Sequence, residues 1–303
     1  MKANTKEEAI QLLKAALDFF EREGQIPPPV VASNSPAQTN NNQPVFAETA
    51  LNELEHLKAL LNEPDWPEAV PQFLICNRTE ADKKERAEGI VDYIDMDLSG
   101  KKILDFGCGE GHLVKLLAEK GINATGYDIQ KQGELEWETT ETGLLTTDWE
   151  KTKAQKPYDV VLLYDVLDHA TDPVSCLKQL REVCTSDTTI IVRTHPFCGP
   201  HGGHLYQKIN KAYVHLIFTE SELAEMGYPL DQLQKVFYPL ATCDTWFKSS
   251  GFSIAKNNTV KTFVPDFFKN NKFVRARISK TYPKEFPEWQ MSQAFNDYVV
   301  KMR

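Results

Sequence analysis

The feature that most constrains the fold is an alternation, beginning after Gly100, of short β-branched runs with segments of helical periodicity. The runs occupy residues 101–106, 122–128, 144–148, 158–164 and 188–194. This alternation is typical of βαβ units, whose strands pair in one parallel sheet while the helices cover both of its faces. We therefore predict an α/β protein with a doubly wound, mostly parallel sheet.

Beyond the fifth run, helical periodicity covers residues 204–226 and 231–249. Two further runs, 251–256 and 272–279, have the residue pattern of strands. In the second of them, aromatic and basic residues alternate with Val274, Ala276 and Ile278. An alternation with period two is expected of a strand that has one face exposed. We predict that both runs are strands.

We divide the chain into four segments: an amphipathic helix over 5–23, a flexible Pro/Asn-rich linker over 24–47, a helical prelude over 48–78 and a main domain over 79–303. Thr5 and Glu8 make a capping box at the start of the first helix. The linker has five prolines and no charged residue, so it cannot bury enough surface to order itself. Thr79 begins a further helix. The first helix is expected either to fold back on the main domain or to dock a partner.

Composition excludes several classes of protein. Lys and Arg total 34 against 43 Asp and Glu, and the net charge of −9 argues against a surface built mainly for nucleic acid or anionic lipid. No apolar run approaches the roughly 20 residues of a membrane span, so we expect no membrane partner. The N-terminus does not have the continuous apolar core of a secretory signal, and the six cysteines show no CxxC spacing. We therefore expect a cytoplasmic protein with reduced thiols.

A glycine-rich loop follows the first predicted strand. In the sequence ILDFGCGEGHL, Asp105 is followed by Gly107, Gly109 and Gly111, and a helix comes next. Glycines let the backbone approach a ligand closely, and the helix N-terminus offers free N–H groups. The dinucleotide fingerprint GxGxxG requires glycine where this chain has His112, which disfavours an NAD-dependent dehydrogenase.

This loop, GxGxG behind an acid, resembles the first motif of the class I S-adenosylmethionine (SAM) dependent methyltransferases, and further motifs follow in the expected order over residues 85–195. The resemblance implies a Rossmann-like sheet with an antiparallel last strand, SAM as cofactor and S-adenosylhomocysteine as product. It implies that Asp128 binds both ribose hydroxyls, which the position of this acid at a neighbouring strand end also favours. It places Asp148 and Trp149 at the adenine. The complete set of cofactor-binding residues that we predict is Asp105, Gly107, Cys108, Gly109, Gly111, His112, Asp128, Ile129, Asp148, Trp149, Tyr164, Asp165 and Val166.

The acceptor is expected above the carboxyl ends of the fourth and fifth strands, where we predict an insertion at about 195–230. Five potential ligand residues lie there: His195, Cys198, His201, His204 and His215. Three interpretations stay open. One histidine, His195 or His201, is a general base; or the set His195, Cys198, His201 and His204 binds a metal; or these side chains only satisfy hydrogen bonds of the loop. We take His195, His201 and His169, which matches a histidine frequent in the family, as catalytic candidates, and we predict no metal.

We expect methyl transfer from SAM to an unidentified small-molecule acceptor bound near residues 195–215. Residues 267–284 interleave basic and aromatic side chains, which suits nucleic-acid binding, although positive charge also protects an edge strand from pairing. Two alternatives stay open. One is a methyltransferase that acts on nucleic acid or protein, and the other is a SAM-fold regulatory protein without turnover.

Overall fold

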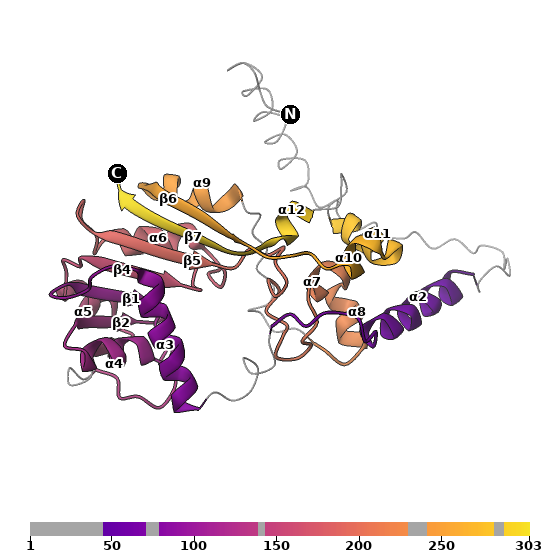
Figure 1. The fold of residues 1–303 in the computed structure, drawn as a ribbon, viewed down its shortest axis with the longest axis horizontal. Coiled ribbons are helices and arrows are strands. Elements are labelled where there is room, and N and C mark those ends of the chain that lie inside the picture. The colour runs from indigo at the N-terminus through magenta and orange to yellow at the C-terminus, as the bar shows by residue number, and fades with distance from the viewer. Residues whose placement is uncertain (1–44, 71–78, 139–142, 230–240, 282–287) are drawn as a thin grey trace, which may run out of the picture. The chain divides into compact units, whose positions relative to one another are not determined.

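The structure is a computed structural model that describes residues 45–70, 79–138, 143–229, 241–281 and 288–303 (Figure 1). The chain divides into two compact units, 1–50 and 51–303, and the features below belong to the second. The predicted helix over 5–23 and most of the predicted linker lie outside the described residues. Helix α2 spans Val45–Leu61, so residues 45–47 are helical and were wrongly assigned to the linker.

Seven strands form one sheet in the order β3-β2-β1-β4-β5-β7-β6. Their bounds are Lys102–Phe106 (β1), Asn123–Tyr127 (β2), Leu144–Thr146 (β3), Val160–Tyr164 (β4), Thr189–Thr194 (β5), Phe252–Lys261 (β6) and Gln293–Met302 (β7). The first five strands pair in parallel, and β7 runs antiparallel to both β5 and β6. The prediction of a doubly wound, mostly parallel sheet with an antiparallel last strand is confirmed.

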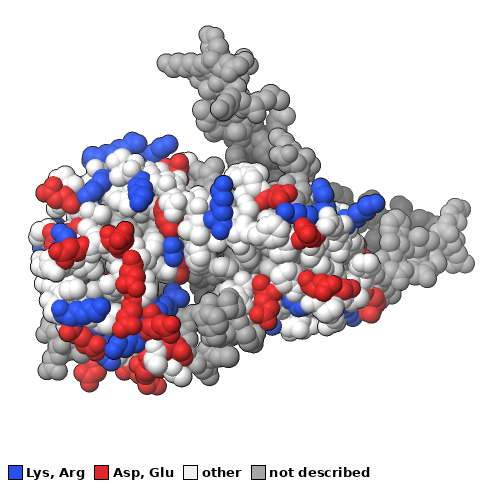
Figure 2. Space-filling view, in the orientation of Figure 1, with Lys and Arg blue, Asp and Glu red and all other residues white. Residues whose placement is uncertain are grey.

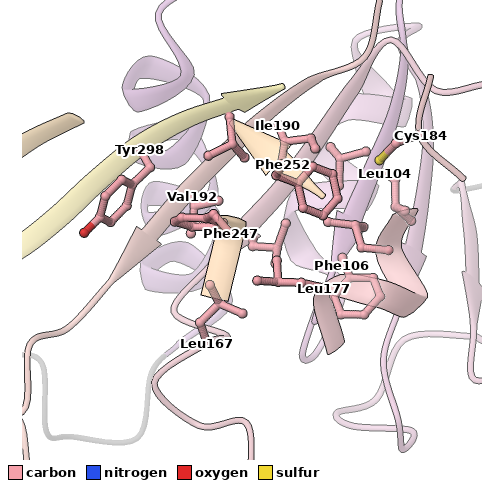
Figure 3. Close-up of a cluster of buried hydrophobic side chains, with 14 of the residues drawn as sticks. Leu104, Phe106, Leu167, Leu177, Cys184, Ile190, Val192, Phe247, Phe252 and Tyr298 are labelled. Atoms are coloured by element: carbon pink, nitrogen blue, oxygen red, sulfur yellow. The ribbon is translucent and has the colours of Figure 1, made fainter. Parts of the chain in front are cut away.

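Two hydrophobic clusters cover the two faces of the sheet, because side chains of successive strand residues point to opposite faces. On one face, Leu104 is in one cluster with Leu177 of helix α6 (Pro173–Arg181) and Phe247 of helix α9 (Ala241–Ser249), as Figure 3 shows in close-up. On the other face, Ile103 and Val160 pack with α3 (Glu80–Ile94) and α4 (His112–Glu119). Helix α5 (Trp149–Ala154) follows β3. The strands are therefore buried on both sides, as parallel sheets require.

The start of α3 follows the predicted rule. The Thr79 hydroxyl accepts the Asp82 N–H, and the Asp82 carboxylate accepts the Thr79 N–H, so the two residues form a capping box. Ile90 and Ile94 bury one face of the helix against the sheet. The prediction of a helix that begins at Thr79 is confirmed.

A third hydrophobic cluster lies among helices outside the sheet. It joins α2 to helices α7 (Val214–Ile217), α8 (Glu220–Glu225), α10 (Asp266–Asn270), α11 (Lys272–Thr281) and α12 (Glu288–Met291). Trp66 is at its centre: the indole N–H donates to the Ala212 carbonyl, and the ring stacks near Phe218 and Phe267. Arg277 of α11 forms ion pairs with Glu53 and Glu222, which link three helices.

The prediction of a strand over 272–279 is wrong, because this segment is helix α11. Val274 and Ile278 are both fully buried, and a spacing of four residues puts them on one helical face. The Asn271 carboxamide oxygen accepts the N–H groups of Phe273 and Val274 at the start of the helix. The alternation of residue types fitted a strand only because hydrophobic and basic residues also alternate along this amphipathic helix.

The helix predicted over 204–226 is correct only in part. Residues 204–213 form turns, and the helical residues are those of α7 and α8. Tyr213 has a left-handed backbone, with φ of 60°, and its N–H donates to the Pro200 carbonyl, so the chain turns there before α7 begins. For the helix predicted over 231–249, α9 supplies the described part, and residues 231–240 lie outside the described chain. The strand predicted over 251–256 is confirmed as the first part of β6.

No helix in the described parts of the chain is long and apolar enough to cross a membrane. The cysteines among the described residues form no disulfide bond; they are Cys108, Cys176, Cys184, Cys198 and Cys243. This agrees with the prediction of reduced cysteines.

A half-buried ion pair joins β5 to β7. Arg193 donates to both carboxylate oxygens of Asp297, at 2.7 and 2.8 Å, and its guanidinium lies 4.0 Å from the ring centre of Tyr93. Removal of one partner leaves the other charge without compensation. We expect Asp297→Ala to lower the free energy of unfolding by about 3–5 kcal/mol in urea titrations. Lys153→Ala, which removes surface ion pairs with Glu150 and Glu182, should lower the free energy of unfolding far less, and equal losses in the two variants would contradict this account.

Candidate functional site

The glycine loop between β1 and α4 has a left-handed backbone that favours glycine. Gly107, Gly109 and Gly111 have φ values of 82, 55 and 84°. A Cβ on Gly107 would lie 2.5 Å from a methyl group of Val166, and one on Gly111 would lie 2.5 Å from a methyl group of Leu145. Close neighbours therefore leave no room for a side chain at Gly107 and Gly111, whereas at Gly109, where nothing lies within 4 Å, only the left-handed backbone favours glycine.

Two acids lie at the carboxyl ends of the strands beside this loop. Asp128 follows β2, is 8% exposed, and accepts the Gly109 N–H at 2.9 Å. Asp105 of β1 is 5% exposed. Burial, and then the charge of Asp128, raise the pKa of Asp105 to about 7. Two buried carboxylates at one edge favour a ligand that carries positive charge and hydroxyl groups.

The buried position of Asp105 predicts a specific pH dependence of stability. Because its folded pKa of about 7 is above the ordinary value of 3.8, its contribution to stability is complete below about pH 4 and is lost as the pH rises through about 7. We expect wild-type protein without ligand to lose up to about 4 kcal/mol more than Asp105→Asn over this range. Urea unfolding at a series of pH values measures the difference. Asp159→Asn, at the opposite end of the sheet, is the control, and equal slopes for wild type and Asp105→Asn would contradict the prediction.

The other predicted loop residues lie around the same edge. Cys108 turns toward β2, where its sulfur would lie 2.9 Å from a Cβ built on Gly126. His112 begins α4, with Nε2 3.3 Å from the Glu110 carboxylate. Ile129 follows Asp128 and is 84% exposed. Such an exposed apolar side chain next to a buried acid is available to contact a flat, apolar ligand group.

Asp148 and Trp149 lie where β3 leads into α5. Asp148 caps this helix, because its Oδ1 accepts the N–H groups of Glu150 and Lys151. The Trp149 ring packs at a steep angle on Tyr127, with ring centres 5.0 Å apart, and its indole N–H donates to Glu182. These contacts fix both residues at the sheet edge, and their predicted role in adenine binding stays a prediction.

Tyr164, Asp165 and Val166 lead out of β4 toward the glycine loop. The Tyr164 hydroxyl accepts from the Arg193 guanidinium at 3.2 Å. Asp165 has a left-handed backbone, with φ of 56°, and forms an ion pair with Arg86 of α3 at 3.3 Å. Because Val166 lies against Gly107, the loop after β4 and the glycine loop are in direct contact.

Asp165, His195 and His201 form a line of contacts. His195 follows β5, and its Nε2 lies 3.1 Å from Asp165 Oδ1. Nε2 of His201 lies 2.7 Å from Nδ1 of His195. Burial lowers the pKa of His195, but the hydrogen bond and the charge of Asp165 have the larger combined effect in the opposite direction. The pKa of His195 is therefore raised. Burial, with the neighbouring His195, lowers the pKa of His201 to about 3. A proton shared by this line therefore resides on His195.

A second group of side chains lies next to this line. Asp168 Oδ2 lies 3.6 Å from Nε2 of His204 and 3.9 Å from Nε2 of His169. The two imidazole rings are 4.2 Å apart, centre to centre. Burial, with the neighbouring histidines, lowers the pKa of His204 to about 3, so this ring is neutral. The predicted catalytic candidate His169 thus lies in this group and not on the line through His195.

The set His195, Cys198, His201 and His204, considered as a metal site from sequence, is not assembled. The Cys198 thiol donates to the carboxamide oxygen of Gln290 at 3.3 Å. Among the described residues, the groups that bring three possible ligand atoms together contain Asp165, Asp168, His169, His195 and His204, without Cys198. His215 also turns away, because its Nε2 bonds to the Phe197 carbonyl.

Sequence analysis missed Asp168 and Arg86. Asp168 lies in the sequence YDVLDH, three residues after Asp165 and just before His169, and two acids at a strand exit were a signal that could have been used. Arg86 is far from Asp165 in sequence, and no local pattern connects the two residues. Only the packing of α3 beside the β4 exit brings the guanidinium there.

Comparison with known proteins places this site in a family. A family model described as a methyltransferase domain matches residues 79–257, more than half of the 303 residues. The chain belongs to the SAM-dependent methyltransferase family. The range of the match includes the glycine loop, Asp128 and the histidines after β5.

Relatives of this methyltransferase are similar over part of their length. It is 30% identical over 105 residues to a ubiquinone biosynthesis O-methyltransferase of Aeromonas salmonicida, covering 32% of this chain and 44% of the relative. It is 29% identical over 157 residues to the Vibrio parahaemolyticus protein of the same name, covering 43% of this chain and 66% of the relative. The chain spans about half the length of the first curated relatives it matches.

Solved structures of methyltransferases are also similar. A SAM-dependent methyltransferase from Archaeoglobus fulgidus has a TM-score of 0.46 at 14% identity. The match covers 73% of this chain and 94% of the Archaeoglobus chain. The magnesium protoporphyrin IX methyltransferase from Synechocystis PCC 6803, with bound S-adenosylhomocysteine, has a TM-score of 0.41 at 16% identity. The match covers 83% of this chain and 94% of the Synechocystis chain.

The residues at the loop fit the cofactor of the family. SAM carries a sulfonium, an ammonium group and two ribose hydroxyls, and the edge offers buried carboxylates at Asp105 and Asp128 for such groups. The close contact of Gly107 with Val166, and of Gly111 with Leu145, makes a cradle that any Cβ would fill. The charge and shape of the site therefore suit SAM.

Proposed function

We propose that this methyltransferase transfers the methyl group of SAM to an oxygen atom of a small-molecule acceptor. The observation that carries the proposal is the line Asp165–His195–His201, which begins at the loop that contacts the glycine cradle. The curated relatives in the comparison are O-methyltransferases by name, which supports an oxygen acceptor.

The predicted cofactor-binding residues have separate tasks in this proposal. The N–H groups of the glycine loop and of the α4 N-terminus bind polar groups of the cofactor. Asp128 accepts the ribose hydroxyls, and Asp105 compensates positive charge. Ile129, Asp148 and Trp149 surround the adenine. SAM supplies a methyl group on a sulfonium, which is already activated, so the protein mainly aligns the acceptor and removes its proton.

His201 and His195 remove that proton together. Nε2 of His201 contacts His195, so proton abstraction is assigned to the other ring nitrogen, Nδ1, which is buried. When Nδ1 takes a proton from an acceptor hydroxyl, the Nε2 proton of His201 passes to Nδ1 of His195, 2.7 Å away. The imidazolium then formed at His195 faces the Asp165 carboxylate, which stabilises it.

The test uses the full chain, SAM and a panel of phenols, catechols and hydroxy acids. We expect release of S-adenosylhomocysteine that depends on one class of acceptor, together with a product heavier by one methylene unit in mass spectrometry. Release that never exceeds the rate with SAM alone, over the whole panel, would contradict a small-molecule oxygen acceptor and favour the regulatory protein without turnover.

The alternative of a nucleic-acid acceptor is less favoured. Arg277, one of the basic residues of the 267–284 segment, is 7% exposed and paired with Glu53 and Glu222. Acidic and basic side chains are interspersed on the face seen in Figure 2. A cytoplasmic location and docking of the N-terminal helix stay predictions.

A further inference from the structure

Three side chains next to the proposed base have the composition of a metal site. Asp168 and His169 come from the loop after β4, and His204 comes from the connection after β5. One ligand atom from each of the three lies within 4.8 Å of the others. Two imidazoles and one carboxylate are the ligand set of many catalytic zinc sites, which keep a further position open.

The carboxylate at the centre of this group is buried without compensation. Asp168 is 8% exposed, and its Oδ1 accepts the Thr194 hydroxyl at 3.2 Å. Its Oδ2 has no hydrogen-bond partner among the described residues and faces the two histidines. A buried carboxylate oxygen without a partner is costly, and a bound cation would remove that cost.

The distances are close to those that a metal requires. Zinc bonds of about 2.0–2.2 Å at tetrahedral angles separate two ligand atoms by about 3.3–3.6 Å. Asp168 Oδ2 lies 3.6 Å from His204 and 3.9 Å from His169, so small side-chain rotations bring all three atoms to an ion. The His169 side chain is 38% exposed, which leaves a path from solvent and room for another ligand.

The neighbouring group Asp165, Asp168 and His195 is less suitable, although its ligand atoms are equally close. Asp165 already forms an ion pair with Arg86, and both nitrogens of His195 face other side chains, Asp165 and His201. A cation there would have to displace these contacts. Asp168 belongs to both groups, and its uncompensated oxygen is directed to His169 and His204.

We propose that Asp168, His169 and His204 bind a divalent ion of the zinc type, and that the ion orients the oxygen of the acceptor. The second part rests on the proposed methyl transfer. The His204 ring lies 5.9 Å from the His195 ring, so the ion would lie beside the line Asp165–His195–His201. An acceptor with two adjacent oxygens, such as a catechol, suits a site with more than one open position.

The test measures metal binding directly. The full chain is freed of metal with EDTA, desalted and titrated with zinc chloride by calorimetry, and cobalt(II) is added separately to record its visible absorption bands. We expect one equivalent of zinc to bind.

Two variants test the ligands. Asp168→Asn keeps the hydrogen bond to Thr194 but loses the charge, and His169→Ala changes a partly exposed side chain, so both variants should fold. Each should weaken zinc binding by roughly tenfold or more.

The control is His56→Ala, which removes an exposed histidine of α2 that is not in this group. It should leave the zinc affinity unchanged. Wild-type protein that binds no zinc, or that binds it with the same affinity as Asp168→Asn and His169→Ala, would overturn the site. SAM titration of the same metal-free protein separates the two proposals: SAM binding without zinc binding refutes only the metal site, and zinc binding without SAM binding supports the metal site and refutes the proposed methyl transfer.

Discussion

Asp128→Ala is expected to weaken SAM binding by about 10²- to 10⁴-fold. Asp128 is buried at the end of β2, where one oxygen of its carboxylate accepts a hydrogen bond from the Gly109 N–H. In our account the same carboxylate accepts two ribose hydroxyls. Hydrogen bonds to a charged group are worth about 1.5–3 kcal/mol each, so the loss of two corresponds to this change in affinity. Calorimetric titration of SAM into wild type and variant measures it.

Asp159→Ala is the matched control for Asp128→Ala. Asp159 also lies at a strand end and accepts a backbone N–H, from Lys102 at 2.7 Å, but at the opposite edge of the sheet. Its replacement should leave the SAM dissociation constant unchanged. A folded Asp128→Ala protein that binds SAM as tightly as wild type would contradict the assignment of this carboxylate to the ribose.

His195→Ala is expected to lower kcat for methyl transfer by about 10²- to 10⁴-fold, the usual contribution of a general base. His195 is the residue to which His201 passes the proton, and Asp165 stabilises the resulting charge. The variant should bind SAM with wild-type affinity, because the glycine loop and Asp128 are unchanged. The measurement is release of S-adenosylhomocysteine at saturating SAM and acceptor.

If His201 and His195 pass one proton in sequence, the losses of kcat caused by substitution of each are not additive. His201→Ala should reduce kcat as much as His195→Ala, and the double variant should be no slower than either single variant. The exposed His56→Ala is the control and should retain wild-type kcat. A double variant that multiplies the two single losses would show that His195 and His201 act independently and would refute the line.

Much of the sheet could be predicted from the sequence, because the signals are local. Each of the five parallel strands is a short β-branched run between helical segments, and β4, from Val160 to Leu163, is buried throughout. The glycine loop also carries its own signal, since Gly107 and Gly111 occupy positions where a Cβ would collide. These features follow from residues close together in the chain.

The C-terminal elements could not be predicted in the same way. The residue pattern of 272–279 fits both a strand and an amphipathic helix. The segment forms helix α11 because Val274 and Ile278 are buried together in the third hydrophobic cluster. An antiparallel last strand was expected, but its position at Gln293–Met302 was not predicted, although Tyr298 and Val300 are buried in the sheet cluster. Its place between β5 and β6 is set by long-range pairing, which a short window of sequence does not contain.

The candidate site shows the same limit. Sequence proximity grouped Cys198 with the histidines, whereas the structure turns its thiol toward Gln290. Asp168 and His204 are far apart in the chain, and only the packing of two strand-end loops brings their side chains to 3.6 Å. Sequence identified His195 and His201, but the hydrogen bond that connects them became visible only in the fold.

The central claim is that the buried carboxylates and the glycine loop form a SAM site. Titration of SAM into the purified full chain by calorimetry, followed by competition with S-adenosylhomocysteine, tests it most directly. We predict one equivalent of SAM with a dissociation constant in the micromolar range, displaced by S-adenosylhomocysteine. A folded protein, shown by a cooperative thermal transition, that binds neither ligand would contradict the claim.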